Sequence, residues 1–519
     1  MFKFLRISVF PLLFLAFAAA SCRSVPAPNA TAPAPVYAPM SEPTSDVIFT
    51  STSEARALDF DGKTLWAATA GGVLRVEHSV ARKWTRHDGL PSNEAFDLER
   101  EDGKLVARFP TSRAVWDGKT WQTQSAPEWK RREPTTQWNG RKVAATLDGL
   151  QIGEAKFSLP VQSSGTHISA LLARGKMLLV AVYGDGLWRF DGKMWTRGPV
   201  VPDEAREILS LAGDDKTLWL GTRRGGIFER TGETWKPLNL ANEPFGHNVQ
   251  NLAQFDGVLW ASTLDDGLIA RTGKGWRHVA PPQISSSAPR QMLEWRGKLY
   301  VRHGGGIVDA FDGASWERDA LKSIPRRGVY ALTGDDKRLL AAGWGGWAEW
   351  DGATWTPHYN LPQLKGVPIM NLAMQGDDVW IGTQSRGLAK WTRATGELKF
   401  FDERDGLNDD WITALCVDGE RVWAGTFVGG LHVYENGKWR AFDATKDANV
   451  TAIVSDKSGG VWATTRRGLF HANEKGAEKV SESWLDDEQQ ALCASEQGLW
   501  IGARTSLDYR QFAGEKEQS

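Results

Sequence analysis

The amino-acid sequence predicts an all-β fold built from about twelve copies of one four-stranded unit. A short apolar phrase recurs at intervals of about 40 residues along almost the whole chain, and a fixed period of this length is typical of a repeat architecture. The phrase reads Leu218-Trp219-Leu220-Gly221-Thr222 in one copy and Val422-Trp423-Ala424-Gly425-Thr426 in another. The chain also contains 54 Gly and 26 Trp against 7 Tyr, which suits short strands joined by tight turns.

One copy shows how each unit is expected to fold. Residues 208–211, 218–222, 227–230 and 235–238 each have the pattern of a short strand, and Asp-rich or Gly-rich turns separate them. Four such strands in about 40 residues make one blade of a β-propeller. The second strands of the successive blades are marked by Trp66, Val106, Val143, Leu179, Trp219, Trp260, Tyr300, Leu340, Trp380, Trp423, Trp462 and Trp500.

Small residues follow the repeated Trp for a steric reason. Gly221 and Gly425 each stand two residues after a Trp, and residues i and i+2 lie on the same face of a strand. We expect these glycines to leave room for the indole and for the next blade. Cys416 and Cys493 occupy one equivalent position in two repeats. We interpret them as small buried apolar side chains, neither a disulfide nor a metal pair.

Twelve blades are expected to form two six-bladed rings. The polar stretch at residues 280–291 falls between blades six and seven, where a domain boundary is wanted. The predicted division is therefore residues 47–283 for blades 1–6 and residues 284–519 for blades 7–12. Residues 47–51 have the pattern of a spare strand, which could complete the short last blade. One large ring, or two interlaced rings closed by this strand, is the alternative.

The N-terminus carries features of a secreted lipoprotein. Lys3 and Arg6 precede an apolar run, so residues 1–21 are predicted to be a signal peptide. The following Cys22 completes a sequence that resembles the bacterial lipoprotein cleavage box, which implies lipidation at Cys22 and a membrane contact through that lipid. An ordinary cleaved signal with a chance cysteine is the alternative. Residues 22–46 are rich in Pro and Ala and predict an extended tether, and Arg23 favours the outer membrane.

Two segments resemble a known repeat family. The first is Asp88-Gly89-Leu90-Pro91-Ser92-Asn93-Glu94-Ala95-Phe96, and the second is Asp405-Gly406-Leu407-Asn408-Asp409-Asp410-Trp411-Ile412 followed by Gly429-Gly430-Leu431. Together with the downstream Trp-Gly-Thr strands they resemble the two-component regulator propeller repeat, over about residues 47–512. In that family such propellers often form the periplasmic sensing part of hybrid histidine kinases. This chain contains no kinase region, so the resemblance implies a binding or docking platform outside the cytoplasm.

Composition and motifs exclude several classes of function. Lys and Arg number 62 against 63 Asp and Glu, so the charge balance gives no support for nucleic acid as a partner. The nine His are dispersed, and no metal site or cofactor is predicted. Paired Asp residues such as Asp335-Asp336, and the Asp117-Gly118 sequence that resembles part of a sialidase Asp-box, are interpreted as hairpin turns.

The candidate binding residues share a place in the repeat. They lie in the loop after the second strand or in the segment that enters the first strand, and propellers place both on one face. Aromatic and Arg side chains gathered there suit a protein, peptide or glycan partner. The candidates are Asn93, Tyr183, Arg223, Arg224, Asp265, Asp266, Trp344, Arg386, Asn408, Asp409, Asp410, Phe427, Arg466 and Arg467.

We expect a lipid-anchored, non-catalytic platform of the cell envelope that binds a partner on this face. Two alternatives remain open. The first is an envelope glycan hydrolase or lyase that uses the same loops, which a central pocket with two carboxylates or a Tyr–Arg cluster would favour. The second is a detached sensor module that presents its ligand to a separate membrane sensor kinase.

Overall fold

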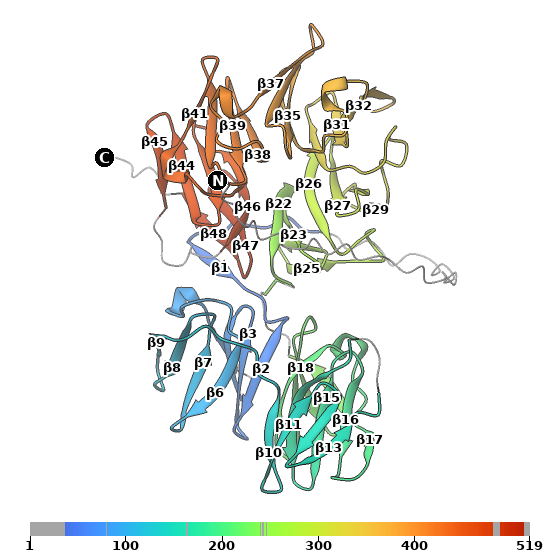
Figure 1. The fold of residues 1–519 in the computed structure, drawn as a ribbon, viewed down its shortest axis with the longest axis vertical. Helices are drawn as coiled ribbons and strands as arrows, with labels where there is room; N and C mark the ends of the chain where they lie inside the picture. The colour runs from blue at the N-terminus through green and yellow to red at the C-terminus, as the bar shows by residue number, and fades with distance from the viewer. Residues whose placement is uncertain are drawn as a thin grey trace, which may run out of the picture. The chain divides into compact units, whose positions relative to one another are not determined.

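The protein folds into four-stranded antiparallel sheets, as the repeat predicts. The computed structural model describes residues 37–512 except 79, 162–164, 239, 241–242, 245 and 481–487. These residues form twelve sheets, in which neighbouring strands are hydrogen-bonded (Figure 1). The expected signal peptide, Cys22 and residues 22–36 of the expected tether lie outside the described residues. No helix of the described part of the chain is long and apolar enough to cross a bilayer.

The sheets are numbered here as blades 1 to 12 in chain order. Blades 1–5 are β2–β5 (Ala55–Phe60, Thr64–Thr69, Gly72–Glu77, Val80–Trp84), β6–β9 (Asp97–Glu101, Lys104–Arg108, Ser112–Trp116, Trp121–Ser125), β10–β13 (Thr135–Trp138, Arg141–Thr146, Gly149–Ile152, Ala155–Ser158), β14–β17 (Ile168–Arg174, Met177–Val182, Gly186–Phe190, Trp195–Arg197) and β18–β21 (Ile208–Gly213, Thr217–Thr222, Ile227–Thr231, Thr234–Pro237).

The remaining blades follow the same plan. Across all the blades, short 3-10 helices occur in five of the connections in the described part of the chain. Blades 6–12 are β22–β25 (Val249–Phe255, Val258–Thr263, Leu268–Thr272, Gly275–Val279), β26–β29 (Pro289–Trp295, Lys298–His303, Val308–Phe311, Trp316–Glu317), β30–β33 (Ala331–Gly334, Leu339–Gly343, Gly346–Trp350, Trp355–His358), β34–β37 (Ile369–Gln375, Asp378–Thr383, Leu388–Thr392, Glu397–Phe401), β38–β41 (Ile412–Asp418, Arg421–Thr426, Leu431–Glu435, Lys438–Ala441), β42–β45 (Val450–Ser455, Val461–Thr465, Gly468–Asn473, Gly476–Lys479) and β46–β48 (Gln489–Ala494, Gly498–Ala503, Leu507–Gln511) with β1 (Val47–Phe49). The 3-10 helices are η1 (Arg86–Asp88), η2 (Asp203–Ala205), η3 (Pro362–Leu364), η4 (Glu403–Asp405) and η5 (Asp443–Thr445).

The predicted spare strand completes the last blade. Strand β1 pairs antiparallel with β48, with Val47 opposite Tyr509, and the sheet has the order β1-β48-β47-β46. Phe49 is buried at 7% exposure. Its ring lies 5.3 Å from the ring of Trp276 and 6.0 Å from that of Trp500. Residues from opposite ends of the chain therefore share one sheet, which is the pairing that the alternative interpretation of the sequence expects.

Contacts between first strands link blades 6 to 12 in order and join blade 12 to blade 6, and they also join blade 5 to blade 1. Strand β2 of blade 1 packs against β18 of blade 5, and β22 of blade 6 packs against β46 of blade 12. Backbone hydrogen bonds repeat this order. The Gly226 amide donates to the Ser53 carbonyl over 2.8 Å, and the Asn248 amide donates to the Arg504 carbonyl over 2.7 Å.

This order differs from the expected division at residue 283. Blade 6 is expected in the first ring, but its Val249 is buried in one apolar cluster with Ala491 and Trp500 of blade 12. Blade 1 meets blade 5 instead, where Leu65 and Trp219 share a cluster. Blade 6, which begins at Val249, therefore packs against blades 7 and 12, whereas the prediction groups it with blades 1–5.

The expected tether ends earlier than residue 46. The ring of Tyr37 lies 5.0 Å from that of Trp260 and 5.4 Å from that of Phe311. Glu42 accepts hydrogen bonds from Ser495 Oγ over 2.7 Å and from Tyr509 over 3.1 Å. An aromatic ring and a carboxylate with partners on the blades hold residues 37–46 against the fold, so this part of the predicted tether is wrong.

The small residues after the repeated Trp have the steric role that the sequence predicts. A Cβ atom on Gly425 would lie 2.5 Å from Val450 Cγ1 of the next blade, and one on Gly221 would lie 2.5 Å from the carbonyl oxygen of Ala55. Cys416 and Cys493 are free thiols, paired across the sheet with Trp423 and Trp500. Burial raises the pKa of Cys416 to about 12 and that of Cys493 to about 11.

Candidate functional site

The loops that carry the candidate residues lie together at one end of the blades. In blades 6, 8 and 9 the loop after the second strand hydrogen-bonds to the segment that enters the next blade. The Gly267 amide donates to the Ser287 carbonyl over 2.8 Å, that of Gly345 to Val367 over 2.9 Å, and that of Gly387 to Asp410 over 2.8 Å. We call this continuous edge the loop rim. Its backbone is held by the fold, so side chains that project from it are positioned before any partner arrives.

Blades 8 and 10 place aromatic side chains on the loop rim. The rings of Trp411 and Phe427 stack with centroids 4.3 Å apart and planes at 14°. Trp344 on blade 8 is 50% exposed, and Val428 on blade 10 is 53% exposed. The Trp344 indole donates a hydrogen bond to the Tyr330 hydroxyl over 2.6 Å. We name Tyr330, Trp344, Trp411, Phe427 and Val428 the aromatic rim.

Two polar candidates hold the aromatic rim in shape. Asp409 accepts hydrogen bonds from the Trp411 amide over 3.1 Å and from the Val428 amide over 2.8 Å, so one carboxylate fixes both segments. The Asn408 amide donates to His432 Nε2 over 3.1 Å. Burial lowers the pKa of His432 to about 4, which keeps the imidazole neutral and able to accept this bond. Asn408 and Asp409 therefore position the rim.

Asp410 has a carboxylate oxygen that accepts no hydrogen bond from the described residues. This oxygen, Oδ1, is buried. Burial, together with the nearby Glu403, Asp402 and Asp409 carboxylates, raises the pKa of Asp410. A buried acceptor without a partner is costly, and a donor group on a bound partner would relieve that cost.

The arginine candidates on blades 9 and 11 are partly committed to the fold. Arg386 donates to the carbonyl of Gln363, and its guanidinium lies 4.8 Å from the Phe400 ring centroid. Arg467 donates to the Lys446 carbonyl over 2.9 Å. Arg466 is exposed. Arg386 lies on blade 9, and Arg466 and Arg467 lie on blade 11. Both blades are next in chain order to blades that carry the aromatic rim.

The remaining candidates lie on other blades. Arg223 donates to the Tyr183 hydroxyl over 3.3 Å. Arg224 forms ion pairs with Asp265 at 2.9 Å and with Asp266 at 3.5 Å, which links blades 5 and 6. Burial and the neighbouring Asp265 raise the pKa of Asp266.

Asn93 differs from the prediction. It is 1% exposed, and its Oδ1 accepts the Arg86 amide over 2.9 Å. A partner would have no access to this side chain, so Asn93 serves the fold and not a binding surface. Sequence reasoning missed Trp411 and Tyr330, although Trp411 directly follows the singled-out Asp410.

A buried His–Asp–Ser cluster in blade 7 does not have the arrangement of a nucleophilic site. His303 Nε2 lies 2.8 Å from Asp309 Oδ2, and Ser285 Oγ donates to Asp309 Oδ1 over 2.6 Å. The hydroxyl thus bonds the carboxylate and not the imidazole base that would activate it. His303 and Asp309 are 1% and 0% exposed, so the cluster is closed to a substrate and serves packing.

The Asp turns that resemble calcium or sialidase motifs are hairpin caps. Asp335 Oδ1 accepts the amides of Lys337 and Arg338 over 2.8 and 2.6 Å, and Asp117 Oδ1 caps its own turn in the same way. No group of three or more His, Cys, Asp or Glu residues in the described part of the chain could hold a metal ion. The capping hydrogen bonds confirm the turn interpretation at Asp335 and Asp117.

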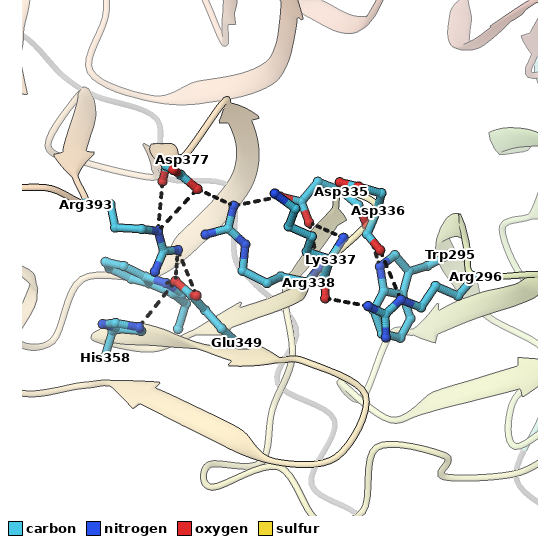
Figure 2. Close-up of polar contacts among 11 residues, drawn as sticks. Trp295, Arg296, Asp335, Asp336, Lys337, Arg338, Glu349, His358, Asp377 and Arg393 are labelled. Atoms are coloured by element: carbon cyan, nitrogen blue, oxygen red, sulfur yellow. Dashed lines mark hydrogen bonds and ion pairs between the residues drawn. The ribbon is translucent and has the colours of Figure 1, made fainter.

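A charge network ties blades 7, 8 and 9 together at the edge opposite the loop rim (Figure 2). Arg296 donates to the carbonyls of Asp336 and Lys337 over 3.1 and 3.0 Å. Farther along, Arg393 donates to both Glu349 oxygens over 2.7 and 2.8 Å. Burial alone would raise the pKa of Glu349, but hydrogen bonding and charge from His358 and Arg393 outweigh it and lower the pKa to about 2.

The comparisons with known proteins support the fold. No family model matches the chain, and no curated protein matches it. Among solved structures, PorZ, an essential bacterial surface component of the type-IX secretion system of Porphyromonas gingivalis, is similar. It has a TM-score of 0.63 and 14% sequence identity, and the match covers 91% of this chain and 88% of PorZ. At this identity the likeness shows a shared fold.

Two further similar structures are extracellular domains of putative hybrid two-component systems from B. thetaiotaomicron. One has a TM-score of 0.44 and 14% identity, with 92% of this chain and 75% of that chain covered. The other has a TM-score of 0.45 and 17% identity, with 87% and 67% covered.

Proposed function

We propose that this protein is a non-catalytic docking platform of the bacterial cell envelope that binds a protein or peptide on the aromatic rim. The observation that carries the proposal is the exposure of apolar side chains in equivalent loops of blades 8 and 10. Trp344 and Val428 are 50% and 53% exposed, and Trp411 and Phe427 form a stacked pair on the same blade as Val428. Trp and other aromatic residues dominate the energy of protein interfaces.

The rim is already organised for binding. Asp409 bonds the backbone on both sides of the stacked pair, and Tyr330 fixes the indole of Trp344. Side chains held in this way lose little conformational entropy when a partner binds, so more of the contact energy remains as affinity.

The location at the envelope rests on the sequence and on a shared fold. The N-terminal pattern that ends at Cys22 favours a lipid anchor, with the outer membrane preferred because Arg23 follows the cysteine. PorZ, which shares the fold, is described as a bacterial surface component. The resemblance of the repeats to two-component regulator propellers makes a separate membrane sensor kinase one partner to seek. A glycan ligand on the same aromatic rim is the competing outcome.

Co-purification from intact cells tests the proposal. The protein would be isolated after mild crosslinking, and its partners would be compared between the wild type and the Trp344→Ala, Trp411→Ala and Phe427→Ala variants. We expect each variant to lose most of the partner while its thermal unfolding stays close to wild type. The matched control is Trp235→Ala, which removes a partly exposed Trp at the opposite edge of blade 5. Equal partner recovery in all four variants would contradict the proposal.

A further inference from the structure

Three arginines surround a cavity between blades 4 and 5. These blades differ from blades 8 and 10, which carry the aromatic rim. The cavity has a volume of about 270 Å³, which suits a small ligand. Its lining combines charged and apolar side chains. The lining residues are Arg174, Met177, Leu179, Arg189, Pro199, Asp215, Leu218 and Arg230.

The strand register explains why these side chains converge. Arg174 pairs with Met177 across β14 and β15, and Leu179 pairs with Arg189 across β15 and β16. Cross-strand partners point to the same side of a sheet, as do residues two apart in one strand. All four therefore lie on one side of blade 4. Blade 5 contacts blade 4 through β14 and β18.

Blade 5 supplies the opposite wall. Its paired residues Leu218 and Arg230 line the same cavity. The apolar residues Met177, Leu179 and Leu218 form the floor between the guanidinium groups. The arrangement is a small apolar cavity with positive charge at its border.

The three arginines of this cavity are only partly balanced by carboxylates within the described part of the chain. Neither Arg174 nor Arg189 forms an ion pair there, and Arg230 pairs only with Glu233, at 3.2 Å, whose side chain is 97% exposed. Arg230 Nε is buried without a hydrogen-bond partner. Hydrogen bonds from the Thr217 and Lys216 amides lower the pKa of Asp214, with a smaller contribution from the Arg174 charge, and Asp214 Oδ1 is committed to those amides of its own turn. Asp215 is the one carboxylate in the lining.

An equivalent cavity elsewhere in the fold shows the contrast. The cavity between blades 1 and 2, of about 460 Å³, is lined by Arg75 and Arg100 among others. Arg75 pairs with Trp66 across the sheet of blade 1. Arg189 occupies the same position of the repeat in blade 4, where it pairs with Leu179. In the cavity between blades 1 and 2 the charges are matched internally, because Arg75 bonds Glu77 and Arg100 bonds Asp59 through two nitrogen atoms.

We propose that the cavity between blades 4 and 5 binds an oxyanion, a carboxylate or a phosphate, carried on a short apolar group. Guanidinium groups match both oxyanions with paired N–H donors. Met177, Leu179, Pro199 and Leu218 would contact the apolar part. The site is separate from the aromatic rim, so it stands or falls independently of the docking proposal.

Calorimetric titration of the purified protein with three small probes tests the site. The probes are hexanoate, butyl phosphate and neutral hexanol, at low ionic strength. We expect at least one anion to bind and hexanol not to bind. Tighter binding of hexanoate assigns a carboxylate ligand, and tighter binding of butyl phosphate assigns a phosphate. Absence of binding by both anions at millimolar concentration, or equal binding of hexanol, would overturn the proposal.

Variants localise the binding. Arg189→Gln and Arg174→Gln should each weaken anion binding by about tenfold or more, because each removes a charge-assisted hydrogen bond, and Arg189→Lys should retain part of it. Arg75→Gln, the matched change in the neutralised cavity, should leave binding unchanged. Thermal unfolding shows that each variant is folded. Equal loss in Arg75→Gln and Arg189→Gln would overturn the assignment to this cavity.

Discussion

Replacement of Phe49 by alanine tests how the two ends of the chain close the last blade. Phe49 belongs to the three-residue strand β1 and is 7% exposed. Its ring packs on Trp276 and Trp500, and the Arg271 guanidinium lies 4.5 Å from its centroid. Truncation of a buried Phe costs about 3–5 kcal/mol. Because β1 contributes few other contacts, we expect this cost to detach the strand from β48.

The assay is denaturant unfolding followed by tryptophan fluorescence, combined with hydrogen exchange of the β48 amides. We expect Phe49→Ala to lower the unfolding midpoint and to expose the β48 amides to exchange. Phe427→Ala is the control, because it removes a partly exposed ring and should cost less than about 1.5 kcal/mol. An unchanged midpoint and unchanged β48 protection in Phe49→Ala would refute the reasoning.

Three further predictions concern packing, pH and the anchor. Gly502→Ala should destabilise the fold by about 1–3 kcal/mol, because the new Cβ would lie 2.5 Å from Val249 Cγ1. A double-mutant cycle with Val249→Ala should show coupling between the two positions. Additive effects would contradict the contact between blades 12 and 6. The pKa of Glu349 is lowered from 4.5 to about 2 in the fold, so its stabilisation is complete above pH 4.5 and is lost as the pH falls toward 2; Glu349→Gln should remove about 2 kcal/mol of acid-sensitive stability, and an identical pH profile would contradict this. Cys22→Ser should release the protein from membranes in cell fractionation, and persistent membrane association would defeat the proposed lipid anchor.

The repeat predicts the blades well because its pattern depends on local structure, the strands and turns within one blade. Trp219 and Trp423 both lie in second strands, as expected, and the spare strand at Val47 pairs where the short last blade needs it. The packing of blade 6 against blade 12 could not be predicted, because the Trp219 and Trp260 phrases look alike. What separates blades 5 and 6 is a contact between Val249 and a blade at the other end of the chain.

The candidate site could be predicted only in part, because contacts with segments distant in the sequence decide which of the candidate residues are exposed. Asn93 and Asn408 stand in similar motifs, yet Asn93 is buried and Asn408 is exposed. The segment that carries Thr505 approaches Asn93, with a side-chain hydrogen bond of 3.5 Å, and a repeat pattern contains no signal for such a distant segment. Variation within the repeat indicated the loops that carry Trp344 and Phe427, and their role in binding stays a prediction. It did not show which polar neighbours, such as Asp409, serve to hold them.

Photocrosslinking in intact cells tests the central claim, that the aromatic rim binds a partner, most directly. A photoreactive amino acid at position 428 would project from the rim, since Val428 is 53% exposed. The matched control is position 438, where an exposed lysine lies at the opposite end of the same blade. We predict a discrete protein adduct from position 428 that is absent from position 438 and is lost in the Trp411→Ala background. Adducts of equal yield from both positions, or an adduct that survives Trp411→Ala unchanged, would contradict the account.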